Sequence, residues 1–394
     1  MIWKEAEQKQ RQIVSWRRQL HQIPEVGLEL PRTKAALCGM LEQMGVSYRC
    51  YESCSAIEVL LQGGRPGKTV ALRCDMDALP IREQTGLPFA AKNGAMHACG
   101  HDAHMAMMLG AIAVLNEHRS ELCGAVKCLF QPGEEGCHGA RRMIGEGALE
   151  SPHVDAMIGL HVTPGIPELE PGMIGYRSGV LMAGSDAFAI TVTGKGGHIS
   201  NTTDVINPFS AAARLALAIQ DKRQTLIDGR EKAVIAVAAI HGGGKDNVVP
   251  DQAMLSGSIR TMDPEARIQL RQWLADTVER IAEEENCACS LCYTDTTGIV
   301  TNDAELTALT ADALHAMLPE IKAVEMTTEV MASEDISDFF EICSGTYLHL
   351  GCGHAGASED YPLHNARFRL NESVLWHGSA ALIQAATAVL NTQR

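Results

Sequence analysis

The class of fold follows from residues 125–149, which read AVKCLFQPGEEGCHGARRMIGEGAL. The apolar run Ala125 to Phe130 predicts a strand, and the Pro-Gly pair that follows ends that strand. Gly139 to Leu149 then predicts a helix, and a second strand is expected from Ala156 to Val162. A strand, a helix and a strand in this order are typical of an α/β domain.

Helices and strands also alternate on the amino-terminal side of this stretch. Helices are expected at Glu5 to Gln22, Glu29 to Met44 and Ala103 to Leu115, and strands at Ile57 to Gln62 and Thr69 to Cys74. The sequence therefore predicts the α/β class, with a mostly parallel sheet covered by helices on both faces.

The pattern changes near Gly184, where two-residue alternation replaces the apolar runs. The expected elements follow the order βαββαβ: strand 187–193, helix 207–220, strands 234–240 and 253–259, helix 264–284 and strand 289–293. This order predicts an inserted α+β domain whose open sheet is covered on one face by two helices. We expect the first domain to comprise residues 1–183 and 299–394, and the insert to comprise residues 184–298.

Length and composition restrict the class of protein. A chain of 394 residues exceeds the size of most single cores, and 46% hydrophobic with 21% charged residues is typical of a globular protein. The formal net charge of −15 opposes binding to nucleic acid and to anionic membranes. Because charges are scattered through residues 1–20, we expect no secretory signal and a cytoplasmic protein. The thirteen cysteines lack a small-scaffold spacing, which argues against a disulfide framework.

The densest group of reactive side chains lies at residues 96–104, MHACGHDAH, in the turn before the expected buried helix. A thiolate and an imidazole both bind divalent ions such as zinc, and this turn can aim Cys99 and His101 at one point. The alternative is that these residues cap and pack the helix, with Asp102 as the cap and His104 in the core. We expect the core role for His104, whereas this segment alone leaves both interpretations open for Cys99 and His101.

Two adjacent carboxylates, Glu134 and Glu135, follow the strand that ends at Phe130. Neighbouring side chains of a strand point to opposite faces, but the Pro-Gly bend relaxes this rule and can bring both carboxylates to one site. An ordinary solvated loop is the alternative for a lone Glu-Glu pair. Acidic or imidazole groups also end two other strands, in the segments DMD (75–77) and GLH (159–161), which favours a site at the carboxyl edge of the sheet.

Six motifs in a fixed order carry a resemblance to a known family. They read DMDALP (75–80), HACGHD (97–102), FQPGEEG (130–136), GLHV (159–162), GKGGH (194–198) and LHN (363–365). In this order they resemble peptidase family M20, subfamily D, which contains hippurate hydrolases, aminoacylases and auxin-conjugate amidohydrolases. The resemblance extends from LHQIPE (20–25) to Phe368, nearly the whole chain.

The resemblance implies a catalytic domain that holds two divalent metal ions. Manganese or zinc suits ligands of these types, and cobalt or nickel is also compatible with them. Glu134 corresponds to the proton carrier, and Asp77 corresponds to a carboxylate that orients a ligand from behind. Cys99 is expected to bridge the two ions, and the full set of implied ligands is Cys99, His101, Glu135, His161 and His364.

The inserted domain carries further residues that the resemblance implicates. His198 resembles a histidine that reaches the partner subunit's site and stabilises the oxyanion, which implies a homodimer or higher homo-oligomer and a lid or dimerisation role for the insert. Asn247 and Arg260 lie in segments similar to the family's site for the substrate carboxylate, and a guanidinium can hold a carboxylate with two hydrogen bonds. The chain departs from the family in lacking a second histidine shortly after His198, and in carrying Ala366 where a proline is usual.

We therefore predict a metal-dependent amidohydrolase that cleaves N-acyl amino acids into a carboxylic acid and a free amino acid with a metal-activated water. A dipeptidase or carboxypeptidase that uses the same site is the nearest alternative. Two further interpretations stay open: Cys99 as a thiolate nucleophile paired with His101 or His161, and a catalytically inert relative that only binds metal. The presence of Glu134 argues against the last, because inert relatives usually lose the proton carrier.

Overall fold

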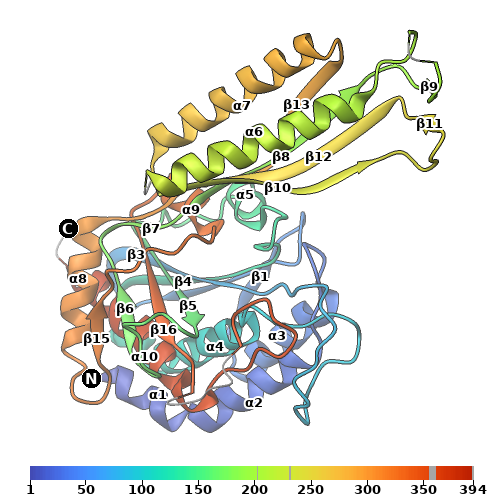
Figure 1. Ribbon diagram of the computed structural model, residues 1–394. Helices are drawn as coiled ribbons and strands as arrows, with labels where there is room; N and C mark the ends of the chain where they lie inside the picture. The colour runs from blue at the N-terminus through green and yellow to red at the C-terminus, as the bar shows by residue number, and fades with distance from the viewer. Residues whose placement is uncertain (202, 230–231, 355–360, 393–394) are drawn as a thin grey trace. The chain divides into compact units, whose positions relative to one another are not determined.

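A computed structural model of the chain describes residues 1–201, 203–229, 232–354 and 361–392. The chain divides into two compact units (Figure 1). Unit 1 comprises Met1–Leu181, Thr301–Glu329 and Asp335–Arg394, and unit 2 comprises Met182–Val300 and Val330–Glu334. The division differs from the predicted one at residues 182–183, 299–300 and 330–334, all of which the sequence had placed in the first domain.

Unit 1 is built on an eight-stranded sheet in the order β1-β2-β4-β3-β5-β16-β6-β15. Four neighbouring pairs, β4-β3, β3-β5, β5-β16 and β6-β15, are parallel, whereas β1-β2, β2-β4 and β16-β6 are antiparallel. The predicted α/β class with a mostly parallel central sheet is confirmed. The strands are β1 (Tyr48–Cys50), β2 (Ile57–Gln62), β3 (Arg65–Asp75), β4 (Cys123–Gln131), β5 (Ala156–Thr163), β6 (Ile174–Tyr176), β15 (Ala323–Glu325) and β16 (Gly345–Gly351).

Helices cover both faces of this sheet. The connections β3-α4-β4 and β4-α5-β5 cross the sheet in opposite directions, so right-handed crossovers place α4 (His101–Glu117) and α5 (Gly139–Gly145) on opposite faces. The single helix expected over residues 5–22 is two helices, separated at Lys9. The other helices of the unit are α1 (Glu5–Gln8), α2 (Gln10–His21), α3 (Pro31–Gln43), α8 (Ala304–His315), α9 (Ile336–Phe340) and α10 (Leu375–Asn391).

Helix α10 is the most apolar helix next to the sheet, and it packs against α4 and β3 (Figure 1). The stretch Glu372–Asn391 has the length and composition of a membrane span, but 67% of its 18-residue apolar window is buried inside the protein. A Cβ at Gly378 would come within 2.1 Å of the Met107 Sδ, so glycine allows α10 and α4 to approach closely. Burial against α4 and the sheet accounts for the apolar composition of α10.

Unit 2 contains a four-stranded antiparallel sheet in the order β10-β12-β8-β13. Buried and half-buried residues alternate along β8, because every second side chain faces the two helices. Figure 1 shows α6 and α7 over one face of this sheet, and the predicted βαββαβ order is observed. The elements are β8 (Gly184–Thr193), α6 (Pro208–Asp228), β10 (Ala233–Gly242), β12 (Gln252–Thr261), α7 (Pro264–Glu284) and β13 (Ala288–Thr297).

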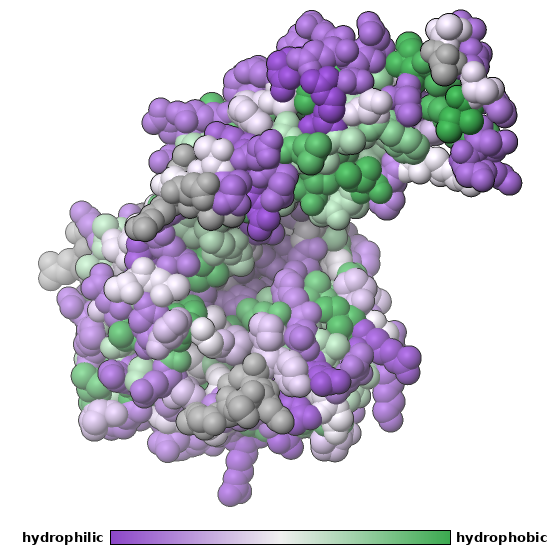
Figure 2. All heavy atoms as spheres, in the orientation of Figure 1, coloured by the Kyte–Doolittle hydropathy of each residue, from purple (hydrophilic) through white to green (hydrophobic). Residues whose placement is uncertain are grey.

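Exposed apolar residues occur on both faces of the unit 2 sheet. Met254 on β12 is 47% exposed on the face away from the helices, whereas Ile240 on the edge strand β10 is 50% exposed but pairs with the buried Leu255 and so lies on the helix-covered face. Figure 2 shows apolar side chains gathered over unit 2. The remaining strands form two short ribbons of two strands each. One pair forms a ribbon at the end of unit 2 and consists of β9 (Gly197–His198) and β11 (Val248–Val249); the other consists of β7 (Gly179–Met182) and β14 (Val300–Asn302).

Candidate metal centre

The carboxyl ends of three parallel strands meet at one edge of the unit 1 sheet. β3 ends at Asp75, β4 at Gln131 and β5 at Thr163, and the three strands are neighbours in the order β4-β3-β5. Helix α4 begins at His101, directly after the end of a loop that follows β3. This arrangement brings acidic, thiol and imidazole side chains from distant segments of the chain to one place.

Cys99, His101 and His161 form the first group whose ligand atoms could hold a metal ion. All three side chains are buried, and the Cys99 Sγ lies 3.5 Å from His161 Nε2. The other ring nitrogen of His161, Nδ1, donates to the Val162 carbonyl at 2.6 Å. The Nε2 lone pair therefore points toward Cys99, and sulfur with two imidazole nitrogens is a ligand set for zinc and similar ions.

Cys99, Glu135 and His364 form a second group of the same kind. His364 Nε2 lies 3.3 Å from the Cys99 Sγ and 3.3 Å from Glu135 Oε1. The backbone of His364 has a φ of +64°, which residues other than glycine rarely adopt outside functional sites. Because Cys99 belongs to both groups, a thiolate at this position could contact two ions at once.

His101 gives a direct test of whether these groups fit a cation. Its Nδ1 donates to the backbone carbonyl of Asp77 at 2.8 Å. Its Nε2 is buried and has no hydrogen-bond partner among the residues that the structure describes. Buried polar atoms are rarely left unpaired, and an imidazole whose Nδ1 donates to a carbonyl presents the Nε2 lone pair that a metal ion requires. The residues present therefore fit a metal ion.

The two adjacent carboxylates reach the site through the turn that follows β4. Gly133 in this turn has a φ of +73°, a value that side chains disfavour. The backbone N–H groups of Glu134 and Glu135 donate to the two carboxylate oxygens of Asp77, at 3.0 and 3.1 Å. Ligand atoms of Glu134, Glu135 and His101 all lie within 4.8 Å of one another. The bend after β4 thus brings both carboxylates to one site, as expected from the Pro-Gly pair.

Hydrogen bonds and burial shift the pKa values of the site when it holds no ion. Hydrogen bonds to Cys99 and Glu135 raise the pKa of His364 to about 10. Burial raises the pKa of the Cys99 thiol. A nucleophilic cysteine needs a lowered pKa, so this environment does not favour the interpretation of Cys99 as a thiolate nucleophile.

The sequence pattern of peptidase family M20/M25/M40 matches residues 71–388, which is most of the chain. The chain belongs to this family. The resemblance carried by the six motifs is therefore confirmed, and this M20 protein is a hydrolase that acts on amides.

Curated relatives of this M20 hydrolase match it along most of their length. Thermostable carboxypeptidase 1 of Saccharolobus solfataricus is 35% identical over 94% of this chain and 93% of its own. N-acetyl-L-cysteine deacetylase of Bacillus subtilis is 33% identical over 97% of this chain and 89% of its own. IAA-amino acid hydrolase ILR1-like 2 of Arabidopsis thaliana is 35% identical over 96% of this chain and 84% of its own.

A solved structure resembles the M20 hydrolase along the whole chain. The Bacillus subtilis YxeP protein is described as a dinuclear metal-binding peptidase of the M20 family. It is 30% identical, covers 98% of this chain with 99% of its own length, and gives a TM-score of 0.81. The ligand groups around Cys99 therefore occur in a fold for which a dinuclear metal site is described.

Three of the predicted site residues lie in unit 2. His198 is exposed at the end of β9, and Asn247 is exposed just before β11. The Ile199 N–H donates to the Asn247 carbonyl at 3.2 Å, so the ribbon brings His198 and Asn247 together. Arg260 lies on β12, is half-buried, and donates from Nη1 to Ser333 Oγ at 3.0 Å.

A buried network behind the strand ends was not predicted from the sequence. Asp75 accepts from His104 Nδ1 at 2.5 Å and from Arg73 Nη1 at 3.0 Å. Arg73 also donates to Gln131 Oε1 at 2.8 Å and to Asp335 Oδ1 at 2.9 Å, and all five side chains are buried. An arginine next to the apolar run Val70 to Leu72 was the available signal, because a buried charge needs partners.

The expected core role of His104 agrees with its surroundings. His104 is buried, its Nδ1 donates to Asp75, and its Nε2 accepts from the Val162 N–H at 2.9 Å. Ligand atoms of His104, Asp75 and His101 lie near one another, but both ring nitrogens of His104 are already engaged. The group of Asp75, His101 and His104 is therefore structural.

The alternative role of Asp102 as the helix cap is wrong. The residue before α4 is Gly100, and no side chain caps this helix. The Asp102 carboxylate instead accepts from Arg17 Nε at 2.8 Å and from His21 Nδ1 at 2.7 Å. A fully buried carboxylate needs charged or hydrogen-bonding partners, and α2 supplies them here.

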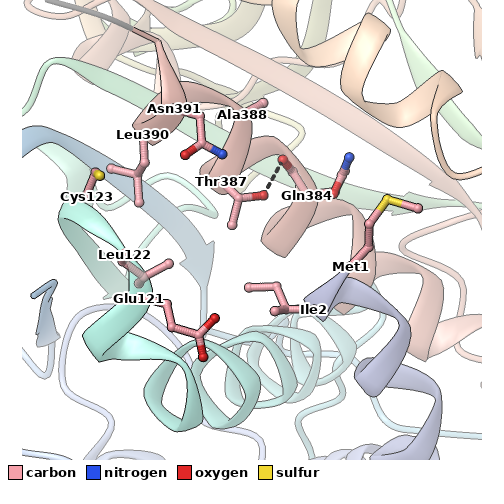
Figure 3. A pocket seen from close by; sticks show the side chains of 10 residues that line it. All are labelled: Met1, Ile2, Glu121, Leu122, Cys123, Gln384, Thr387, Ala388, Leu390 and Asn391. Carbon is pink, nitrogen blue, oxygen red and sulfur yellow. Dashed lines mark hydrogen bonds between the residues drawn. The ribbon is translucent and has the colours of Figure 1, made fainter.

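A pocket of about 350 Å³ lies at the opposite edge of the unit 1 sheet, where β4 begins and α10 ends. Figure 3 shows Leu122, Thr387 and Leu390 among the side chains around it. The lining offers one carboxylate, Glu121, and one thiol, Cys123. Its lining lacks the cluster of metal-ligand atoms found around Cys99, so we do not assign the catalytic site to this pocket.

Proposed function

We propose that the protein is a dinuclear-metal amidohydrolase that cleaves N-acyl amino acids into a carboxylic acid and a free amino acid. One observation carries this proposal: Cys99 belongs to two ligand groups, one with His101 and His161 and one with Glu135 and His364. Manganese or zinc, or else cobalt or nickel, suits these ligands. When bound, such ions lower the pKa of a water between them and polarise the attacked carbonyl.

Glu134 is the proton carrier in this proposal. Its carboxylate lies close to ligand atoms of His101 and Glu135 but belongs to neither of the groups that contain Cys99. It takes a proton from the attacking water and later delivers that proton to the departing amine nitrogen. Asp77 holds the backbone N–H groups of both glutamates and so keeps Glu134 beside the water.

Residues of unit 2 recognise the substrate in this proposal. Arg260 and Asn247 hold the free carboxylate of the amino acid, and His198 donates a hydrogen bond to the developing oxyanion. N-acetyl-L-cysteine, which appears in the name of one relative, carries such a carboxylate. The exposure of His198 and Asn247 on one ribbon supports their availability to a substrate.

The neighbouring glutamates allow a sharp test of the roles. Metal analysis of the purified protein should find two divalent ions per chain. Glu134→Gln should keep both ions and lose about 10²- to 10⁴-fold in kcat, whereas Glu135→Gln should lose one ion. Ion-free protein that still hydrolyses N-acyl amino acids, or a Glu134→Gln variant with unchanged kcat, would contradict the proposal.

A carboxypeptidase is the second candidate, because one relative at 35% identity bears that name. A carboxypeptidase releases the last amino acid of a peptide, so its substrate carries an amino-acid residue where the amidohydrolase substrate carries a simple acyl group. Purified protein loaded with each metal should be assayed with N-acetyl and N-benzoyl amino acids, dipeptides and N-acyl dipeptides. A higher kcat/KM for simple N-acyl amino acids supports the first proposal, and a higher value for peptides supports the second.

We also propose that the protein is a homodimer in which His198 serves the partner subunit's site. Two exposed apolar residues of the unit 2 sheet, Met254 on its open face and Ile240 on the edge strand β10, support an interface. Mixing Glu134→Gln chains with His198→Ala chains tests this, because each mixed dimer would contain one complete site. After subunit exchange, activity should recover to about a quarter of the unsubstituted value. A monomeric mass, or no recovery in proven mixed dimers, would contradict it.

A further inference from the structure

A second buried histidine is joined to the proposed ligand His161 through one residue of β5. His161 Nδ1 donates to the Val162 carbonyl, and the Val162 N–H donates to His104 Nε2. His104 Nδ1 in turn donates to Asp75 Oδ1. We propose that Asp75 and His104 are positioning residues that hold the end of β5 so that His161 presents Nε2 to its ion. This inference rests on the proposed metal centre.

The end of β5 needs support because it has a strand neighbour on only one side. Its pairing with β16 continues to Thr163, whereas its pairing with β3 ends at Gly159. The N–H of Val162 therefore lies beyond the last paired residue on the β3 side, and His104 Nε2 accepts it at 2.9 Å. A buried N–H left without an acceptor is costly, so a histidine ring takes the place of a strand at this point.

The hydrogen bonds allow His104 only one protonation state. The Val162 N–H can only donate, so Nε2 must accept, and the proton must then lie on Nδ1 facing Asp75. Arg73 donates to the second oxygen of Asp75 at 3.0 Å and holds the carboxylate in place. Arg73, Asp75 and His104 are each at most 2% exposed. The ring is therefore neutral and fixed in orientation.

Val162 also contacts the turn that carries two further proposed ligands. Gly100 lies between Cys99 and His101, and a Cβ at Gly100 would come within 2.4 Å of Val162 Cγ2. The position of Val162 thus determines the spacing between His161 and the Cys99 turn. Through one backbone N–H, His104 acts on all three members of the first ligand group.

Two substitutions separate the two hydrogen bonds of His104. Asparagine places an amide nitrogen near the position of Nδ1 and can still donate to Asp75, but it is too short to reach Val162. Glutamine places its amide oxygen near the position of Nε2 and can still accept from Val162. His104→Asn should lower the affinity for one of the two ions by about 10- to 100-fold, and His104→Gln should lower it less.

The readout is the number of ions retained per chain across a series of chelator concentrations, measured by mass spectrometry. The unsubstituted protein and His104→Gln should release both ions only at high chelator concentration. His104→Asn should release one ion at a lower concentration. Excess metal should restore the kcat of His104→Asn, because the variant lacks an ion and not a reacting group. His104→Asn that retains both ions as the unsubstituted protein does overturns the positioning role.

A matched control separates positioning from general loss of stability. His21 donates to Asp102, on the same helix α4, at 2.7 Å, and neither residue bonds to β5. His21→Asn can keep this bond but loses the contact from Nε2 to Glu83 Oε1 at 3.2 Å, so it should lower the unfolding midpoint of the ion-free protein without early release of an ion. Early release from His21→Asn, at an equal loss of stability, would also overturn the proposal. Unsubstituted protein that binds no ion would instead contradict the proposed function itself.

Discussion

The backbone carbonyl of Asp77 accepts a hydrogen bond from His101 Nδ1 at 2.8 Å. The carboxylate of the same residue accepts the backbone N–H groups of Glu134 and Glu135. Asp77 therefore contacts the proposed ligand His101 through its main chain. Its side chain contacts the proposed ligand Glu135 and the proposed proton carrier Glu134. These contacts support the proposal that Asp77 orients the site and does not itself bind an ion.

Asp77→Asn should lower metal affinity and kcat by about 10- to 100-fold. An asparagine has one acceptor oxygen, and its NH₂ group would face the N–H of Glu134 or Glu135. Asp155→Asn is a matched control, because Asp155 accepts the Thr69 N–H at 2.7 Å near the amino ends of β3 and β5. Metal analysis and steady-state kinetics should show the loss only at Asp77, and equal losses in both variants would refute its supporting role.

Cys99→Ala should release both ions, whereas His364→Ala should release one. The reason is that Cys99 belongs to both ligand groups and His364 belongs only to the group with Glu135. Mass spectrometry of the metal content after dialysis checks this prediction without any assay of activity. A Cys99→Ala variant that keeps one ion at full occupancy would show that the cysteine does not bridge.

Gly100→Ala should disturb the metal centre far more than Gly94→Ala. Both residues have positive φ, +91° and +88°, so the backbone cost of about 1 kcal/mol is shared. At Gly94 nothing lies within 4 Å of an added Cβ, but at Gly100 the Cβ would meet Val162 Cγ2. Overpacking should cost roughly 1–3 kcal/mol more at Gly100. Urea unfolding and metal retention of both variants measure the difference, and equal values would exclude the contact.

Much of the fold is predictable where local chemistry marks the ends of elements. Helix α7 has the predicted bounds because Pro264 occupies its first turn and the Asp263 side chain accepts from the Glu265 N–H at 2.7 Å. Strand β16, in contrast, was not located from the sequence. Its place between β5 and β6 results from pairing across the sheet, which the short run GTYLHLG (345–351) does not reveal.

The candidate site also contains a part that was predictable from the sequence and a part that was not. The order of the motifs located Cys99, His101 and Glu135, and the structure brings their ligand atoms together. The contact between His104 and Val162 could not be predicted, because it joins α4 to a strand 58 positions later in the sequence. A hydrogen bond between segments this far apart depends on the packed fold and leaves no periodic signal.

His21 should make the stability of the protein depend on pH above neutrality. Burial and the nearby Arg17 oppose its protonation. The charge of Asp102 and hydrogen bonds to Asp102 and Glu83 outweigh them and raise the pKa of His21 to about 9. Protonated His21 therefore stabilises the folded state fully below its ordinary pKa of 6.5, and this contribution is lost as pH rises through about 9. His21→Gln should consequently lower the urea midpoint of ion-free protein more at pH 6.5 than at pH values above 9. A His21→Gln effect that stays constant with pH would mean that folding does not raise the pKa of His21.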